Sequence, residues 1–171
     1  MDRDLRTTAT INCVCGQVAV VAVGAPIASV VCYCDDCQEG ARLIQSLPNA
    51  VPIQEPDGGT AYLAYRKDRV RVLRGESLLR PLKIRESSAT NRVIATCCNT
   101  PLLLNFDDRK HWVDLYRSRC HDGVLPVQMR ICTKFKPKGC TIPTDARQHP
   151  RYPVSLLMKL ALAKAAMVLR L

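Results

Sequence analysis

The sequence predicts a mainly β, metal-supported domain with one helix at its C-terminal end. Three observations lead to this expectation: short apolar runs with strand-like alternation, three clusters of cysteine, and a final segment rich in helix formers. The 171 residues suit one domain, and the 47% of apolar residues suffices for a hydrophobic core. This composition excludes a disordered chain.

The strand-like segments alternate with turn signals. Apolar runs around a Cys-rich turn predict two strands within residues 8–23, and residues 38–47 predict a short helix. Residues 48–59 contain three prolines and a Gly-Gly pair, which predicts a loop. Further strands are expected at 60–65, 69–74, 78–85 and 92–97. Leu102–Leu104 and Trp112–Tyr116 are candidate core segments.

Three parts follow from this pattern. Residues 1–136 form the metal-binding domain, residues 137–153 a proline-rich loop, and residues 154–171 an apolar helix packed on the domain or on a partner. Packing on a second copy would give a homo-oligomer. The last segment carries three cations and is shorter than the roughly 20 apolar residues that cross a bilayer, so no membrane span is expected.

Charge is distributed unevenly along this basic chain, which has a net charge of +10. Residues 66–92 carry nine Lys or Arg against three acids, whereas residues 32–60 have an acidic excess. The basic stretch is either a solvated strand face or an anion-binding surface. Nucleic acid is allowed by the charge, but the 5% of aromatic residues and the lack of a reading helix count against it.

Cysteine is abundant, with ten residues, and the charged N-terminal segment lacks the apolar run of a signal peptide. We therefore expect a cytoplasmic, reducing location, where clustered cysteines more often bind metal than form disulfides. Thiolates at these spacings are typical zinc ligands, and three thiolates within six residues can hold a zinc with an open fourth position. The clusters are Cys13-Val14-Cys15-Gly16, Cys32-Tyr33-Cys34-Asp35-Asp36-Cys37 and Cys97-Cys98-Asn99-Thr100-Pro101.

Together these motifs resemble the glutathione-dependent formaldehyde-activating enzyme family, which includes the centromere protein V-like proteins. The resemblance covers roughly residues 10–105, and Arg71–Glu76 resembles the family's middle strand and turn. It implies a β-tent, Mss4-like, zinc-supported fold and carbon–sulfur lyase chemistry on glutathione and small aldehydes. It also implies a structural zinc on Cys13, Cys15 and Cys98, and a catalytic zinc on Cys32, Cys34 and Cys37.

The third motif departs from the family pattern. Ala95 stands where the family has a cysteine, and Cys97 is present beside Cys98 instead. Either Cys97 completes the first site with Cys13, Cys15 and Cys98, or it closes the Cys32/Cys34/Cys37 site. The first arrangement is favoured because Asn99 tolerates the left-handed conformation that such a turn needs.

Two main functions follow, with the question of enzyme activity left open. The first is a zinc protein resembling lyases that act on glutathione–aldehyde adducts, with a small-molecule thiol as substrate. The second is a non-catalytic zinc module with a basic surface for an acidic partner; a thiol redox or metal-buffering role is a third. Asp35 and Asp36 are expected as solvent-facing turn residues, with a proton-acceptor role as the alternative. The spacings of Cys120, Cys132 and Cys140 match no metal motif, so we expect small core residues there.

Overall fold

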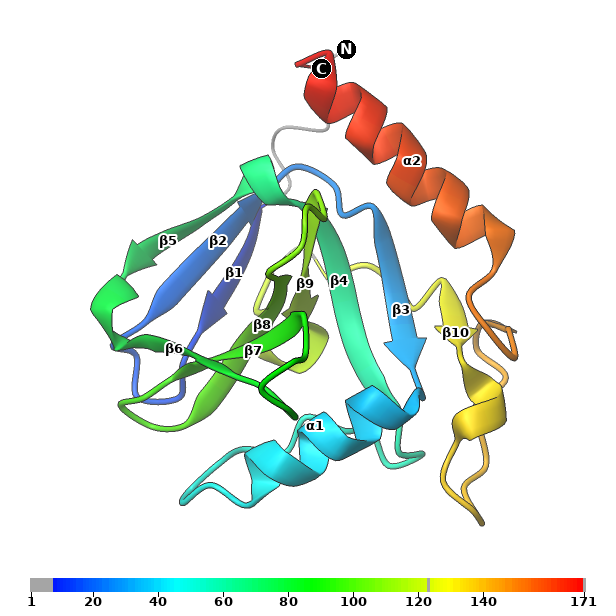
Figure 1. The fold of residues 1–171 in the computed structure, drawn as a ribbon, viewed down its shortest axis with the longest axis horizontal. Coiled ribbons are helices and arrows are strands. Elements are labelled where there is room, and N and C mark those ends of the chain that lie inside the picture. Colours follow the sequence, from blue (N-terminus) through cyan, green and yellow to red (C-terminus); the bar gives the residue numbers. More distant parts are fainter. Residues whose placement is uncertain (1–7, 123, 171) are drawn as a thin grey trace.

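The computed structural model describes residues 8–122 and 124–170, and its β-strands form two sheets (Figure 1). The smaller sheet has the order β1 (Thr8–Asn12), β2 (Ala19–Val23), β5 (Val70–Arg74). The larger, eight-stranded sheet has the order β11 (Arg147–Gln148), β10 (Met129–Ile131), β3 (Ala28–Cys32), β4 (Thr60–Arg66), β9 (Trp112–Tyr116), β8 (Thr100–Phe106), β7 (Thr90–Ala95), β6 (Leu79–Leu82). The expectation of a mainly β chain is confirmed.

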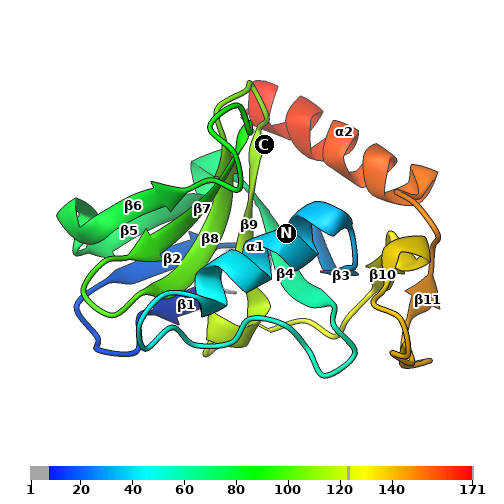
Figure 2. The same cartoon turned by 60° about the horizontal axis from the view of Figure 1, so that its bottom comes forward.

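Two α-helices accompany the sheets, α1 (Asp35–Gln45) and α2 (Val154–Val168), and the latter confirms the predicted C-terminal helix. In Figure 1, α1 crosses the bottom of the molecule and α2 runs along its upper right; Figure 2 shows both helices from another side. Single-turn 3-10 helices occur at Lys67–Arg69, Glu76–Leu78, Arg117–Arg119 and Thr133–Phe135.

One face of the large sheet packs against the small sheet. Alternate side chains of a strand point to opposite faces, so Leu63 and Tyr65 of β4 and Leu115 of β9 share this side. They meet Ile11 of β1 and Val20 of β2 in one core, and all five side chains are fully buried. This core fixes the position of the β1–β2 turn relative to the β7–β8 turn.

The opposite face of the large sheet packs against the helices. Tyr62 of β4 and Leu104 of β8 lie here in a second core, together with Ile44 of α1 and Leu156 of α2. Leu156 is the buried residue of α2, and Leu160 packs partly against the same core. Within the described residues, no helix is long and apolar enough to cross a membrane.

A buried ion-pair network connects β10, near one edge of the large sheet, to neighbouring loops. Arg130 of β10 pairs with Asp57 at 2.7 Å and with Asp145 at 2.7 Å, and Asp57 also accepts a 2.6 Å hydrogen bond from Tyr33. Arg130 and Asp57 are both nearly fully buried, so each charge depends on the other for compensation. The network joins β10 to the loop before β4 and to the segment before β11.

Candidate metal centre

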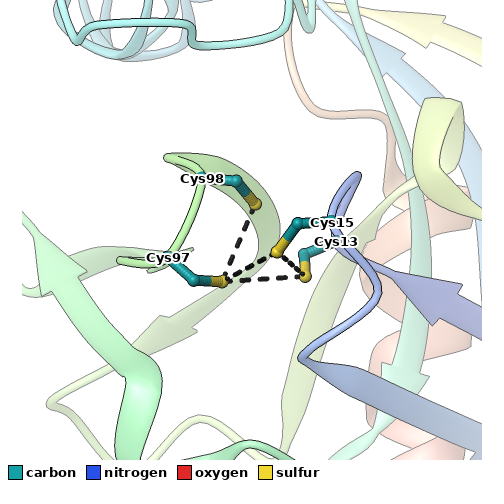
Figure 3. Close-up of side chains that lie close together, drawn as sticks. All are labelled: Cys13, Cys15, Cys97 and Cys98. Carbon is teal, nitrogen blue, oxygen red and sulfur yellow. Dashed lines mark hydrogen bonds between the residues drawn. The ribbon is translucent and has the colours of Figure 1, made fainter.

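Four cysteine thiols from two distant turns meet in one cluster (Figure 3). The Sγ atom of Cys97 lies 3.8 Å from that of Cys13, 3.3 Å from that of Cys15 and 3.8 Å from that of Cys98. Cys13 and Cys15 are 3.4 Å apart. A tetrahedral zinc with Zn–S bonds of about 2.3 Å has sulfur atoms about 3.8 Å apart. The cluster therefore has the dimensions of a four-thiolate zinc site.

The backbone of both turns explains this convergence. Gly16 has a φ of 77°, which L side chains rarely adopt, and it bends the chain directly after Cys15. Asn99 has a φ of 53°, the left-handed conformation expected for it, and its side-chain amide donates to the carbonyl of Pro48 at 2.9 Å. Because residues 96–99 form a turn rather than the end of the expected strand 92–97, Cys97 and Cys98 are not forced to opposite faces.

Thr100 ties the two turns together beside the thiols. Its Oγ1 accepts a 3.2 Å hydrogen bond from the backbone N–H of Val14 and lies 3.0 Å from Cys98 Sγ. Burial raises the pKa of Cys98, but hydrogen bonds with the Thr100 side chain and the backbone of Cys15 outweigh it and lower that pKa to about 6. A thiolate at Cys98 is thus favoured, as metal binding requires.

The second cluster comes from one continuous segment at the junction of β3 and α1. Cys32 ends β3, Cys34 is the residue before the helix, and Cys37 lies in its first turn. Their three Sγ atoms all lie within 4.8 Å of one another. Hydrogen bonds with the thiols of Cys32 and Cys37 lower the pKa of Cys34 to about 3. The positive end of the helix dipole acts in the same direction on this thiolate.

This triplet, Cys32, Cys34 and Cys37, lines a cavity of about 320 Å³, whereas none of the four cysteines of the first cluster does. The cavity lies between the helix-facing side of the large sheet and the two helices. Its walls are mostly apolar or aromatic, including Phe106, Trp112 and Leu156, and its charged members are Asp36, Arg92, Lys110 and Asp114.

Asp114 and Arg92 are two ionisable residues of the cavity that the cysteine motifs did not point to. Asp114 projects from β9, and burial raises the pKa of its carboxyl from 3.8 to about 7. Arg92 projects from β7 and is 2% exposed. In the sequence, Asp114 could have been noticed as a lone carboxylate between the apolar residues Val113 and Leu115. Arg92 could have been noticed as the last cation of the basic stretch 66–92.

A fourth thiol, Cys132, lies beside the triplet. It follows Ile131, which pairs with Cys32 across β10 and β3, and it is buried in the same core as Cys32 and Cys37. A hydrogen bond between the Cys132 and Cys32 thiols is the largest cause that raises the pKa of Cys32. Cys132 is not among the three thiols that lie mutually close. Nothing in the spacing of Cys132 along the chain pointed to this contact.

The remaining expected residues have simpler positions. Asp35 and Asp36 are exposed, but they lie in the first turn of α1 rather than in a loop, because the helix begins three residues before the expected boundary. Cys120 packs against the first core and Cys140 lies in the segment before β11, so neither joins a cluster. All ten cysteines lie within the described ranges and all are free thiols.

Together these features define a mainly β protein with two candidate thiolate metal sites, one of four cysteines and one of three. Residues 8–51 match the family model described as glutathione-dependent formaldehyde-activating enzyme. The resemblance to this family is thereby confirmed over the segment that contains Cys13, Cys15 and the triplet.

A crystal structure of a Rhodobacter sphaeroides protein aligns with 68% of this chain and 91% of its own chain, at 16% identity and a TM-score of 0.47. No curated protein matches the sequence.

Proposed function

We propose that this chain is a zinc protein that makes and breaks a carbon–sulfur bond between a small thiol and an aldehyde. One observation carries the proposal: the three-thiol cluster lines the cavity of about 320 Å³ between the sheet and the helices, and the four-thiol cluster lies outside that cavity. Four protein ligands close a zinc site, and three leave a position for a ligand. The first cluster is therefore the structural site and the triplet the catalytic one.

The donor sets support zinc in both positions. The residues that would hold the structural ion are Cys13, Cys15, Cys97 and Cys98, whose sulfur separations of 3.3 to 3.8 Å suit a tetrahedral ion. Cys32, Cys34 and Cys37 would hold the other. A zinc on three thiolates supplies Lewis acidity and keeps a substrate thiol deprotonated at neutral pH.

The chain's own residues provide the rest of the chemistry. Phe106, Trp112 and Leu156 give the cavity an apolar wall against which the hydrocarbon part of a substrate can pack. When the thiol sulfur bonds to the aldehyde carbon, the C=O bond becomes C–OH and the thiol's proton ends on that oxygen. With a pKa near 7, Asp114 can hold this proton and release it during each turnover. The reverse reaction uses the same groups and needs no oxidant or reductant.

The direct test compares the formation and breakdown of glutathione–aldehyde adducts by the zinc-loaded wild type, Cys34→Ser and Cys140→Ser. Cys140 belongs to neither cluster, so it controls for the loss of a thiol elsewhere. We expect Cys34→Ser to lose more than about 100-fold in rate, since loss of even an outer partner of a metal ligand costs 10- to 100-fold. Cys140→Ser should retain the wild-type rate.

Two outcomes would contradict this assignment. Equal rates in the two variants would remove the triplet from the reaction. Two bound zinc ions without any rate above the uncatalysed reaction would favour the alternative, a non-catalytic zinc module.

A further inference from the structure

The guanidinium of Arg92 is a buried cation without a matching anion. The residue is 2% exposed, and its Nη2 donates to the backbone carbonyl of Asp36. Its Nη1 has no hydrogen-bond partner, and no carboxylate of residues 8–122 or 124–170 forms an ion pair with it. An unpaired charge is strongly unfavourable in a protein interior. We therefore expect the guanidinium of Arg92 to bind an anion in the functional state of the protein.

Arg92 lies at the triplet's end of the cavity. It lines the same cavity as Cys34 and Cys37, and its partner Asp36 directly precedes Cys37 in the chain. Gly40 of α1 makes room for the guanidinium, because a Cβ at this position would lie 1.8 Å from Arg92 Nε. The side chain is thus held between β7 and the first turns of α1, beside the candidate metal thiolates.

The carboxyl group of Asp114, on the same face of the sheet, does not form an ion pair with Arg92. Arg92 pairs with Leu104 and Leu104 pairs with Asp114, so Arg92 and Asp114 lie two strands apart in one row across the sheet. Adjacent strands are 4.7–4.9 Å apart, which separates the two backbones by about 10 Å. The apolar side chain of Leu104 stands between them, and the cavity opens in front of this row.

We propose that Arg92 binds a carboxylate of the substrate, so that this site selects small thiols that carry a carboxylate group near the sulfur. This inference rests on the proposed function, because it places the thiol on the triplet. The free Nη1 carries two N–H donors, and a guanidinium matches the planar carboxylate with charge-assisted hydrogen bonds. The apolar walls then receive the hydrocarbon part of the ligand.

The experiment measures binding rather than turnover. Protein loaded with Co²⁺ is titrated with 3-mercaptopropionate and with 3-mercaptopropionamide, which differ only in the charge and donor pattern of the carboxyl group. Thiol binding is followed by the cobalt–thiolate absorption. We expect the wild type to bind the carboxylate about 10- to 100-fold more tightly, as suits hydrogen bonds between charged partners.

Two variants test which cation of the cavity causes the preference for the carboxylate. Arg92→Gln should bind both thiols equally, whereas Lys110→Gln, which removes another cation of the same cavity, should keep the wild-type ratio. If Arg92→Gln does not fold, Gly40→Ala serves instead, because the added Cβ displaces the guanidinium without removing it. We expect Gly40→Ala to reduce the preference as well.

The outcomes separate this inference from the proposed function. If the wild type binds both thiols equally, or if Arg92→Gln keeps the preference, the assignment of Arg92 is wrong while thiol binding at the triplet stands. Weaker metal retention in Arg92→Gln with an unchanged preference would show that Arg92 only balances the charge of the thiolates, which also overturns the assignment. If neither thiol changes the cobalt spectrum, the proposed function fails and this inference with it.

Discussion

Cys132 shows how strongly the role of a single residue depends on the tertiary fold. It lies 95 positions after Cys37 in the sequence, yet its thiol contacts Cys32 because β10 runs parallel to β3 in register. A fourth thiolate on the triplet would close the position that the proposed reaction needs. The proposed function therefore requires that Cys132 stays a neighbour of the triplet and does not bind the metal.

We expect Cys132→Ser to keep two metal ions per chain. The three mutually close thiols of the triplet remain, and Cys132 is outside that group. Metal content of the purified variant, measured by elemental analysis beside Cys120→Ser as a control, tests this expectation. Loss of one ion in Cys132→Ser alone would show that the site has four thiolates.

Asp114 predicts a pH dependence of stability. The folded chain keeps a proton on this carboxyl up to about pH 7, whereas the ordinary value is 3.8, so wild-type stability falls as pH rises between these values. Asp114→Asn removes this penalty. We expect the free energy of unfolding of the variant to exceed that of the wild type. The difference should grow between pH 4 and 7 and reach roughly 2–4 kcal/mol above pH 7.

Urea denaturation of both proteins at pH 4.5, 6 and 8 measures this gain. Taking the difference at each pH cancels the titration of the cysteines, which both proteins share. Arg92, Lys110 and Asp36 line the same cavity and remain in both proteins. A difference that stays constant over this range would contradict the raised pKa.

Among the elements, α1 and β10 decide how the site is built. The hydrophobic pattern predicted a helix over 38–47, but α1 begins at Asp35, directly after Cys34. Cysteine is not a preferred residue before a helix, so the usual start signal was missing. Asp35 and Asp36 in the first turn interact favourably with the helix dipole and support the earlier start.

The anchoring of β10 depends on its buried ion pair. We expect Asp57→Ala to destabilise the chain by about 3 kcal/mol, because Asp145, which is half exposed, is then the one carboxylate of the described residues that is paired with the buried Arg130 charge. Glu39→Ala removes an exposed pair with Arg42 and is the matched control, with no measurable loss. Chemical denaturation of both variants makes the comparison, and equal losses would contradict the role given to the pair.

At the scale of the whole molecule, the two clusters connect the chain in different ways. The first joins turns that are more than 80 residues apart, since Cys13 meets Cys97 with a sequence separation of 84. The triplet spans six residues at one strand–helix junction. A cross-link between distant segments restricts the unfolded chain more than a local one does. The four-thiol site should therefore carry most of the metal-dependent stability.

We expect Cys15→Ser to lose one of two metal ions and to lower the melting temperature by about 10 °C. Cys34→Ser should also lose one ion, with a clearly smaller change in melting temperature. Calorimetry combined with metal analysis tests both variants. A larger drop for Cys34→Ser than for Cys15→Ser would reverse the roles of the two clusters.

The sequence by itself determined the features that depend on local spacing. The alternation of apolar residues indicated a mainly β chain, the final segment indicated α2, and the spacing of Cys32, Cys34 and Cys37 indicated one cluster, because a strand end and one helical turn bring such residues together. Only the tertiary structure decided the partners of Cys97, the contact of Cys132, and the position of Arg92 and Asp114 in the lining of one cavity. These depend on which strands become neighbours although they are distant in sequence, as β3 and β10 are, and the spacing of residues within one motif does not determine that order.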